Sequence, residues 1–428
     1  MKNITIREAY DWLYLEEHLT NTEYVHLVQF LEQKYKDENV IEMGIRRLRF
    51  INLVGVIQLK TVRIEILPKL ALDNEERLNR RSLLNMLSQT RQLPVQLNER
   101  TLSEFEKTDL SHILGYLYVT ELYKALKRGL YRGYEQKTEN LKHLKGRLLV
   151  PQHIRTNGTH SVNAFCEFDE LSPNIPLNQV LKAALKIIHP YLKNMEIKTK
   201  TLFIFELLEE VEDVYANQQL IEKIQMNRQN QHYEGVLQLA IAIIKSTMMN
   251  TSVNHQIAYS FLFKMNDLYE AYVGECLKRV VGPMQLQLDL QHKEKRLLVN
   301  VHSGRENISL KPDFVISKIE QNQPIPTVIL DTKWKSILTN SHVTYSQADI
   351  YQMYAYITAY KTATRCILIY PKIEEDVLLP KWLVPEISPE KHIEIKMVRL
   401  DKVQNTIDDL GGLLLNSFEK GDNDTTIT

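Results

Sequence analysis

Three charged side chains occur in or beside two strongly apolar segments of this sequence. Asp313 stands at the head of one segment, in "LKPDFVI", and Asp331 and Lys333 stand at the end of the next, in "TVILDTKWK". Side chains of a β-strand alternate between its two faces, so Asp331 and Lys333 point the same way if this segment is a strand. Two charges on one face of an apolar strand indicate a chemical role.

The segment between the two apolar runs predicts a turn that pairs them. In "SKIEQNQPIP", Asn322 lies at the middle among polar residues and proline, which is typical of a hairpin. If the pairing is symmetrical about Asn322, opposed residue numbers sum to about 644, and Asp313 faces Asp331. Directly opposed Cβ atoms are about 4.5 to 5.5 Å apart. Two carboxylates at that distance repel unless a cation lies between them.

A divalent metal ion is the cation that this arrangement favours. Mg²⁺ accepts one or two carboxylates, keeps several waters and leaves positions for a substrate phosphate. Lys333 would lie beside that metal, where it could stabilise charge on a scissile phosphate or help to orient and deprotonate the attacking water. The pattern therefore predicts a metal-dependent phosphodiesterase site.

Two predicted helices bring further polar groups toward these residues. In the helix before the strands, the apolar stripe leaves Glu270 at its edge, where an acid can face a neighbouring cleft. In the helix after the hairpin, Gln352 and Tyr356 are four residues apart and share a face, with Asp349 one turn before them. This pair offers an amide and a phenol to a phosphate or to Lys333.

Each of these residues also has a purely structural interpretation. Asp331 and Lys333 could form an exposed salt pair, and short DxK matches are common by chance. Glu270 alone is typical of a solvated helix boundary, and Tyr356 alone of a core aromatic. The order of an acid on a helix, PD, an apolar hairpin, DxK and QxxxY is what a single metal site requires, and it favours the functional interpretation.

The elements that position these residues predict an α/β fold, or α+β over the whole chain. Residues 255–418 alternate helix and strand patterns that predict a mixed sheet flanked by helices. Residues 1–95 predict a β-containing N-terminal domain, with strand-like runs such as "VRIEIL" before Pro68. Residues 96–254 follow a period of 3.6 and predict a helical middle region. The polar tail, 419–428, predicts disorder.

One stretch of the middle region, "RGLYRGYEQKTENLKHLKGRLL", is rich in Arg, Lys and Tyr. Such a composition could contact phosphates, but we favour a solvated connector. The whole chain holds 53 Lys and Arg against 53 Asp and Glu. Any nucleic-acid surface must therefore come from a local concentration of cations, because phosphate binding needs clustered charge.

Cysteine usage and hydropathy indicate a protein of a reducing compartment. Cys166, Cys276 and Cys366 have no CxxC spacing, which argues against a disulfide framework, a structural zinc site or an iron–sulfur cluster. The longest apolar run, "VLQLAIAII", has about half the length that a bilayer crossing needs. The first residues lack the apolar region of a signal peptide. We therefore expect a cytoplasmic protein with no membrane association.

The charged motifs match the PD-(D/E)xK nuclease superfamily, with "KPD" as the first element and "DTK" as the second. The Gln352 and Tyr356 pair resembles the extra motif of its RecB-like branch. Most of the chain resembles the McrC family, the nuclease subunit of McrBC-type 5-methylcytosine-dependent restriction systems. The matching stretches are "GVIQLKTVRIEILPKL", "RGLYRGYEQKTENLKHLKGRLL", "FDELSPNIPLNQVLKAAL", "MNDLYEAYV", "LKPDFVI", "VILDTKWK" and "DIYQMYAY".

The resemblance implies a restriction-endonuclease-like C-terminal domain that cleaves modified double-stranded DNA with Mg²⁺, or with Mn²⁺ in its place. It also implies a partner, an AAA+ GTPase ring of the McrB type, that reads the DNA. This chain contains no GxxxxGK[ST] motif, so GTP would be bound by the partner. By analogy with the family, the N-terminal and middle regions would engage the ring and stimulate its GTP hydrolysis.

On this hypothesis the site residues have distinct roles. Asp313 and Asp331 hold the metal with the carbonyl of Thr332, and Glu270 supports a metal or a water. Lys333 assists the water and the phosphate charge. Gln352 and Tyr356 orient Lys333 or the DNA backbone. Two alternatives remain at this point: a stand-alone RecB-like repair nuclease that acts on DNA ends, and a non-catalytic scaffold or activator of an AAA+ partner.

Overall fold

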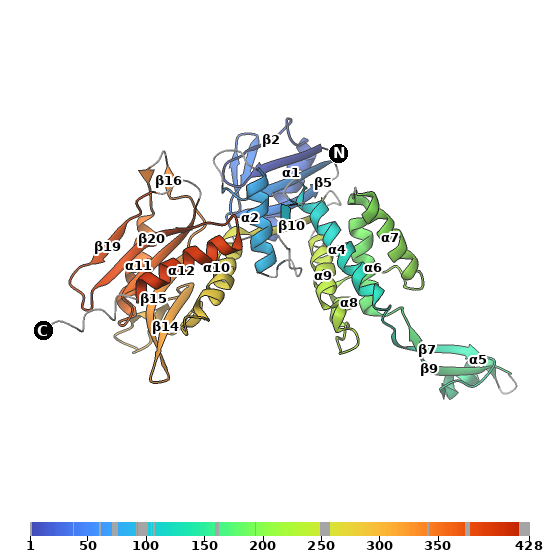
Figure 1. Cartoon of the computed structure of the whole chain (residues 1–428). Helices are drawn as coiled ribbons and strands as arrows, with labels where there is room; N and C mark the ends of the chain where they lie inside the picture. Colours follow the sequence, from blue (N-terminus) through green and yellow to red (C-terminus); the bar gives the residue numbers. More distant parts are fainter. Residues whose placement is uncertain are drawn as a thin grey trace. The chain divides into compact units, whose positions relative to one another are not determined.

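The computed structural model describes the chain as two compact units (Figure 1). Unit 1 comprises Met1–Ile57, Thr61–Lys107 and Leu262–Thr428, and unit 2 comprises Gln58–Lys60 and Thr108–Phe261. The residues described are 2–36, 38–59, 61–70, 76–90, 92, 102–103, 105, 108–158, 162–192, 194–248, 257–339, 342–372 and 377–418. Most residues of the predicted N-terminal and nuclease domains fall in unit 1. The tail 419–428, predicted to be disordered, lies outside the described residues.

The N-terminal part of unit 1 is rich in strands, as the apolar alternation predicts. Its elements are β1 (Lys2–Arg7), β2 (Leu13–Tyr14), α1 (Asn21–Lys34), β3 (Ile41–Gly44), β4 (Arg47–Phe50), β5 (Leu53–Leu59), β6 (Val62–Leu67) and α2 (Glu76–Gln89). One sheet has the order β1-β6-β5-β10, where β10 is Ile257–Lys264, and a smaller sheet has the order β2-β4-β3. Helix α1 begins with a capping box, in which Thr20 and Glu23 satisfy each other's backbone N–H groups.

Strand β6 is buried on both faces, although its sequence alternates apolar and charged residues. Its two charged side chains, Arg63 and Glu65, are almost fully enclosed. Arg80 of α2 forms an ion pair of 2.6 Å with Glu65. A charge can be buried in this way because a partner compensates its loss of hydration.

Unit 2 is mainly helical and also contains a small sheet. Its elements are α4 (Leu110–Lys127), β7 (Gly133–Leu141), β8 (Arg147–Leu148), α5 (Val150–Asn157), β9 (Ala164–Ser172), α6 (Pro176–Ile188), η1 (His189–Tyr191), α7 (Met195–Leu207), α8 (Gln218–Glu222), η2 (Gln231–Tyr233) and α9 (Glu234–Met248). The stretch that the sequence favoured as a solvated connector has no buried residue, as predicted, but it contains β7 and β8, so its assignment as a connector is wrong. β7 pairs antiparallel with β9 from Gly133 opposite Ser172 to Leu141 opposite Ala164. No residue of β7 is buried, so its sequence carries no apolar alternation that could reveal the strand.

The C-terminal part of unit 1 contains the mixed sheet that the sequence predicts. Its elements are α10 (Met265–Val281), β11 (Gln287–Leu290), β12 (Arg296–Val299), β13 (Glu306–Ser309), β14 (Phe314–Glu320), β15 (Gln323–Thr332), β16 (Leu338–Thr339), β17 (His342–Val343), α11 (Gln347–Ala359), β18 (Arg365–Pro371), β19 (Lys381–Val384), β20 (Lys391–Val398) and α12 (Val403–Phe418). The six-stranded sheet has the order β11-β14-β15-β18-β20-β19. β18 pairs parallel with β15 and β20, and the other neighbours pair antiparallel.

Helices cover both faces of this sheet. Helix α11 packs on the face that carries Val315, Ile329 and Leu368, and together they form a buried core. Helix α10 packs on the opposite face, where Gly274 lies against the ring of Phe314, and α12 packs against α10 (Figure 1). The alternation of β15 places Asp331 on the face of Ile329, so Asp331 lies on the α11 side of the sheet.

The hairpin of β14 and β15 has the predicted register near Asp313 and Asp331, but its register next to the turn differs by one residue from the prediction. The turn residues are Gln321 and Asn322, both with positive φ, and Glu320 pairs with Gln323. The numbers of opposed residues therefore sum to 643 near the turn, one less than predicted. A bulge next to Ser317 restores the predicted sum, so that Phe314 pairs with Leu330. This pairing brings Asp313 level with Asp331.

The N-terminal and C-terminal parts of unit 1 meet directly behind the DTK segment. Trp334 donates its indole N–H to the carboxylate of Glu8, which is fully buried. Asn52 accepts from the backbone N–H of Met265 at 3.1 Å, and its side chain accepts from Asn266 at 2.7 Å, so α10 starts against the same region. The segment that carries Asp331 and Lys333 is therefore attached to the N-terminal part through Trp334, the residue that follows Lys333.

Stability should depend on pH through Glu8. Burial raises the pKa of Glu8 from its ordinary 4.5 to about 7, although the charge of Lys69 opposes the rise. Between these two values the folded protein holds a proton that the unfolded chain has released, so stability falls as the pH rises through this window. Between pH 5 and pH 8, the free energy of unfolding should therefore fall by about 2.5 kcal/mol less in Glu8→Gln than in the wild type.

Urea unfolding of both proteins at the two pH values measures this difference. Glu32→Gln is the matched control, since Glu32 is exposed on α1 and should leave the pH dependence unchanged. An equal pH dependence in wild type and Glu8→Gln would contradict the expected role of Glu8.

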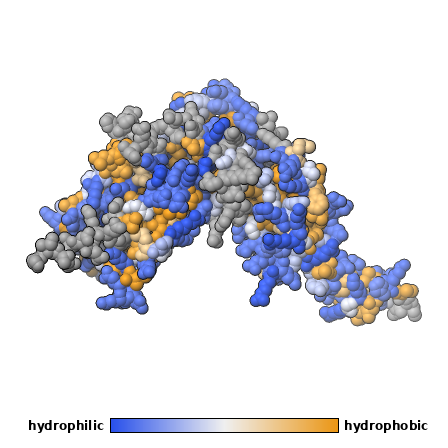
Figure 2. All heavy atoms as spheres, viewed as in Figure 1, coloured by the Kyte–Doolittle hydropathy of each residue, from blue (hydrophilic) through white to orange (hydrophobic). Residues whose placement is uncertain are grey.

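None of the described helices is both long and apolar enough to span a membrane. On the face of the molecule drawn in Figure 2, hydrophilic residues predominate over smaller hydrophobic areas.

Candidate active site

Asp331 lies at the end of β15 and is 1% exposed. Its carboxylate forms an ion pair of 2.5 Å with the Nζ atom of Lys333. Burial, together with the nearby charge of Asp313, raises the pKa of Asp331 to about 7. The exposed-salt-pair interpretation is therefore wrong for Asp331, because this carboxylate is enclosed.

Asp313 precedes β14 and is held beside β15 by two hydrogen bonds. The backbone N–H and the hydroxyl of Thr332 each donate to Oδ2 of Asp313 at 2.6 Å. Among the residues that the structure describes, both hydrogen bonds to the Asp313 carboxylate fall on Oδ2, so Oδ1 can serve a cation. Asp313 and Asp331 thus lie close enough for their charges to interact, as the hairpin register predicts.

A hydrogen-bonded relay runs from Lys333 to helix α11. Lys333 donates to Oε1 of Gln352 at 3.0 Å, and Nε2 of Gln352 donates to the hydroxyl of Tyr356 at 2.8 Å. Tyr356 in turn donates to the carbonyl of Lys311 at 3.0 Å, two residues before Asp313. Burial raises the pKa of Tyr356, so its phenol stays a donor at neutral pH. The relay fixes the direction of the Lys333 ammonium relative to Asp331.

A second polar network lies beside the first and includes residues that the sequence did not single out. Asp349 of α11 forms an ion pair of 2.5 Å with Lys335 and accepts from Tyr370 of β18 at 3.1 Å. Lys335 follows Asp331 and Lys333 with the two-residue period of a strand, and this period is a signal that could have revealed it. The charge of Asp349 also acts on Asp331, which it helps to keep protonated.

Glu270 approaches the site from helix α10, on the other layer of the domain. The predicted apolar stripe is buried along the helix, and Glu270 lies at its edge, half-buried. It accepts a hydrogen bond of 2.9 Å from Nε2 of Gln291, whose backbone N–H donates to the carbonyl of Asp313 at 2.8 Å. Burial raises the pKa of Glu270, and the charge of Asp313 adds to this effect. Gln291 therefore links Glu270 to Asp313.

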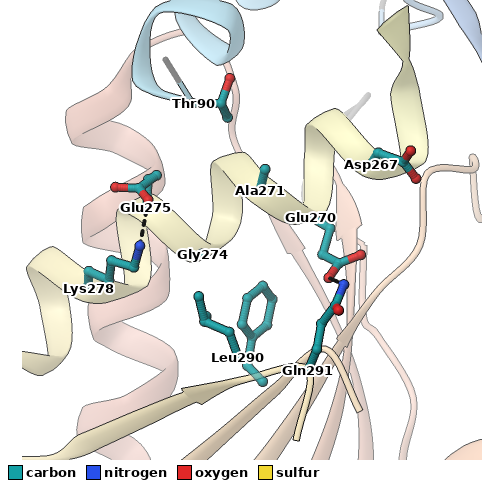
Figure 3. A pocket seen from close by; sticks show the side chains of 10 residues that line it. Thr90, Asp267, Glu270, Ala271, Gly274, Glu275, Lys278, Leu290 and Gln291 are labelled. Carbon is teal, nitrogen blue, oxygen red and sulfur yellow. Dashed lines mark hydrogen bonds and ion pairs between the residues drawn. The ribbon is translucent and has the colours of Figure 1, made fainter. Parts of the chain in front are cut away.

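Glu270 borders a cavity of about 580 Å³ (Figure 3). Its lining includes Asp267, Glu275 and Lys278 of α10, and Phe314, the residue that follows Asp313. Figure 3 shows the Glu270 side chain directed to Gln291 across this space, while Glu275 pairs with Lys278 at 2.6 Å. The cleft that the helix pattern predicted beside Glu270 is thus present.

The donor set suits a hard divalent cation with few protein ligands. No group of three or more His, Cys, Asp or Glu side chains in the described ranges is arranged to hold a metal. The two acids at the strand ends, Asp313 and Asp331, leave the remaining positions to waters, a backbone carbonyl and a substrate phosphate, which is the coordination that Mg²⁺ prefers. Their mutual repulsion would be relieved by the cation.

Comparison with known proteins agrees with these motifs. Residues 48–371 match the family model described as the McrBC 5-methylcytosine restriction system component. This chain belongs to the McrBC family. The match includes Asp313, Asp331, Lys333, Gln352 and Tyr356, and it extends far beyond them into the N-terminal part.

Individual McrBC-family relatives are distant in sequence. The type IV methyl-directed restriction enzyme EcoKMcrBC of Escherichia coli K12 is 21% identical over 298 residues, which are 66% of this chain and 82% of that protein. A chain in the half-complex from the tetradecameric assembly of Thermococcus gammatolerans McrB AAA+ hexamers with bound McrC has a TM-score of 0.72 at 17% identity. That alignment covers 96% of this chain and all of the other, so the fold is shared over nearly the whole length.

A second solved McrBC structure, the complex from Thermococcus gammatolerans determined by cryo-electron microscopy, has a TM-score of 0.52 at 18% identity. It covers 66% of this chain and 88% of the matched chain. At these identities the structural likeness concerns the fold alone.

Proposed function

We propose that this chain is the Mg²⁺-dependent endonuclease subunit of a modification-dependent restriction complex that hydrolyses phosphodiester bonds in double-stranded DNA. The observation that carries the proposal is the arrangement of Asp313, Asp331 and Lys333 at one end of a hairpin, in a chain of the McrBC family. A buried carboxylate beside a second carboxylate and a lysine has no evident structural benefit, because apolar residues of similar size would cost less to bury.

The site residues would act as follows. Asp313 and Asp331 would hold Mg²⁺ with the carbonyl of Thr332. When bound, the metal would polarise the scissile phosphate and lower the pKa of a water. Lys333, oriented by Gln352, would donate hydrogen bonds to a phosphate oxygen and stabilise its developing charge. Tyr356 holds Gln352 in place, and Glu270 would accept a hydrogen bond from a water at the edge of the cavity.

We further propose that an AAA+ GTPase of the McrB type is the partner that delivers modified DNA to this site. The Thermococcus gammatolerans structures are complexes of McrB with McrC, and the Escherichia coli relative is a methyl-directed restriction enzyme. The partner would bind GTP, and this chain would stimulate its hydrolysis. The free, buried state of Cys166, Cys276 and Cys366 is consistent with action in the cytoplasm.

Cleavage assays with purified components test this function. Plasmid containing 5-methylcytosine should be cut by the chain together with its AAA+ GTPase partner of the McrB type, in the presence of GTP and Mg²⁺. Unmethylated plasmid, omission of GTP and addition of EDTA are the controls, and each should prevent cutting. Cutting of DNA ends by the chain alone would favour a stand-alone repair nuclease. Stimulated GTP hydrolysis without any cutting or Mg²⁺ binding would favour a scaffold.

A further inference from the structure

A hairpin of β12 and β13 stands outside the six-stranded sheet. The segment "RLLVNVHS" lies within residues 255–418, for which the sequence predicts a mixed sheet, but its strand belongs to a separate two-stranded sheet, with Arg296 opposite Ser309 and Val299 opposite Glu306. Residues 293–308 are all exposed. Because an isolated two-stranded hairpin is marginally stable in water, its position must be set by what holds its base. We call residues 293–309 the arm.

The base of the arm is attached to the candidate active site. On the incoming side, His292 forms a hydrogen bond of 2.7 Å with the hydroxyl of Tyr360, the residue directly after α11. Gln291, one residue earlier, bonds to both Glu270 and the backbone of Asp313. On the outgoing side, the N–H of Leu310 donates to the carbonyl of Lys295 at 3.0 Å. The arm therefore projects from a fixed point next to Asp313.

The arm carries a local excess of positive charge in a chain whose formal charge is zero. Its basic residues are Lys293, Lys295, Arg296 and Arg305, and its acids are Glu294 and Glu306. Within the described ranges none of the four cations is recorded in an ion pair, whereas Glu294 lies 3.4 Å from His292. Arg296 donates to the hydroxyl of Ser309 at 3.2 Å, inside the arm itself. The exposed cations can thus meet an external anion without breaking an internal pair.

We propose that the arm binds the phosphate backbone of double-stranded DNA beside the scissile bond, through Lys293, Lys295 and Arg305. This inference rests on the proposed function, because DNA is its occupant. Clustered cations bind DNA mainly by releasing counterions from the phosphates, so they need no sequence-specific contact. A phosphate-binding element fixed at the base of the site positions the duplex relative to Asp313 and Asp331.

The test compares a triple variant with a charge-matched control. Lys293→Ala with Lys295→Ala and Arg305→Ala removes the cations but keeps Arg296, which supports the arm. The control combines Lys36→Ala, Lys361→Ala and Lys402→Ala, all exposed residues of unit 1. Binding of a fluorescent unmethylated duplex by the full chain, with Ca²⁺ in place of Mg²⁺, is measured by anisotropy at several salt concentrations.

The triple variant should bind DNA at least about tenfold more weakly, and the slope of log K against log salt should fall by about 2 to 3, or roughly 0.9 for each lost phosphate contact. The control variant should keep the wild-type slope. Lys293→Arg with Lys295→Arg, in place of the alanines at these two positions, should recover most of the affinity, which separates lost charge from misfolding. Wild-type affinity and slope in the triple variant, or no DNA binding by the wild type, would overturn the proposal.

The same variants separate this proposal from the proposed function. If the wild type does not cut DNA but the triple variant loses binding, the arm binds DNA and the endonuclease assignment fails. If the wild type cuts methylated plasmid and the triple variant binds and cuts equally well, only the arm proposal fails.

A second copy of the chain is the alternative occupant of the arm, because it could cover the exposed side chains of Leu297 and Val299. The arm proposal would also be overturned if two results came together. These are that the double variant Leu297→Ser with Val299→Ser no longer self-associates, and that the triple variant binds DNA as the wild type does.

Discussion

Asp331→Asn should abolish DNA cleavage, with a fall in rate of at least about 10³-fold, because the amide cannot replace a charged metal ligand at the reacting phosphate. The measurement is the initial rate of cutting of methylated plasmid with the AAA+ partner, GTP and Mg²⁺. Asparagine has the shape of aspartate, so the substitution removes charge without creating a cavity.

Stability distinguishes this result from simple misfolding. Asp331 is enclosed and is repelled by Asp313, so the neutral variant should lose none of its free energy of unfolding. Lys333 keeps its hydrogen bond to Gln352 and part of its hydration. Partner binding and stimulation of GTP hydrolysis should therefore match the wild type. Cutting of modified plasmid by Asp331→Asn at a wild-type rate would sink the metal-site assignment.

Lys333→Ala should reduce the rate of cleavage by about 10²- to 10³-fold, because one preorganised cation at the developing phosphate charge typically contributes that much. Unlike Asp331→Asn, it should leave Mg²⁺ binding intact, since the ammonium is no metal ligand and its loss removes a competing positive charge. Isothermal titration with Mg²⁺ and single-turnover cleavage measure the two properties separately.

Gln352→Ala is the graded control for this effect. It removes the acceptor that directs Lys333 but keeps the lysine, so it should cost less, about tenfold, in the single-turnover rate. Lys335→Ala, in the adjacent network with Asp349, should change the rate little if Lys333 is the cation that acts. Equal losses in all three variants would indicate a general disturbance of the sheet and would contradict a specific role for Lys333.

Much of the local architecture could be predicted because it depends on neighbouring residues. The apolar runs around Asp313 and Asp331 predicted two strands, and their turn residues predicted an antiparallel pair. The predicted register holds at the site even though the turn is centred differently, since a bulge next to Ser317 compensates. The apolar stripe of α10 likewise placed Glu270 at its edge.

Other features could not be predicted because their partners lie far away in the sequence. β7 pairs with β9 through exposed polar residues, so its strand character comes from the pairing and not from an apolar period. The apolar residues of β12 are typical of a strand, but β12 pairs with β13 and not with the six-stranded sheet. Gln291 lies in a polar segment with no pattern of its own. Its role follows from its contacts with Glu270 of α10 and with the backbone of Asp313, which are distant from each other in the sequence.

The sequence by itself determined which charged side chains share a face, because backbone periodicity alone places Asp331 beside Lys333 and Gln352 beside Tyr356. The tertiary structure decided what those side chains meet. It joined Lys333 to Gln352, enclosed Asp331, and brought Glu8 from the other end of the chain against Trp334. These contacts depend on the packing of the sheet against the helices. Packing excludes water, and a polar contact is stronger in the resulting medium of low dielectric constant.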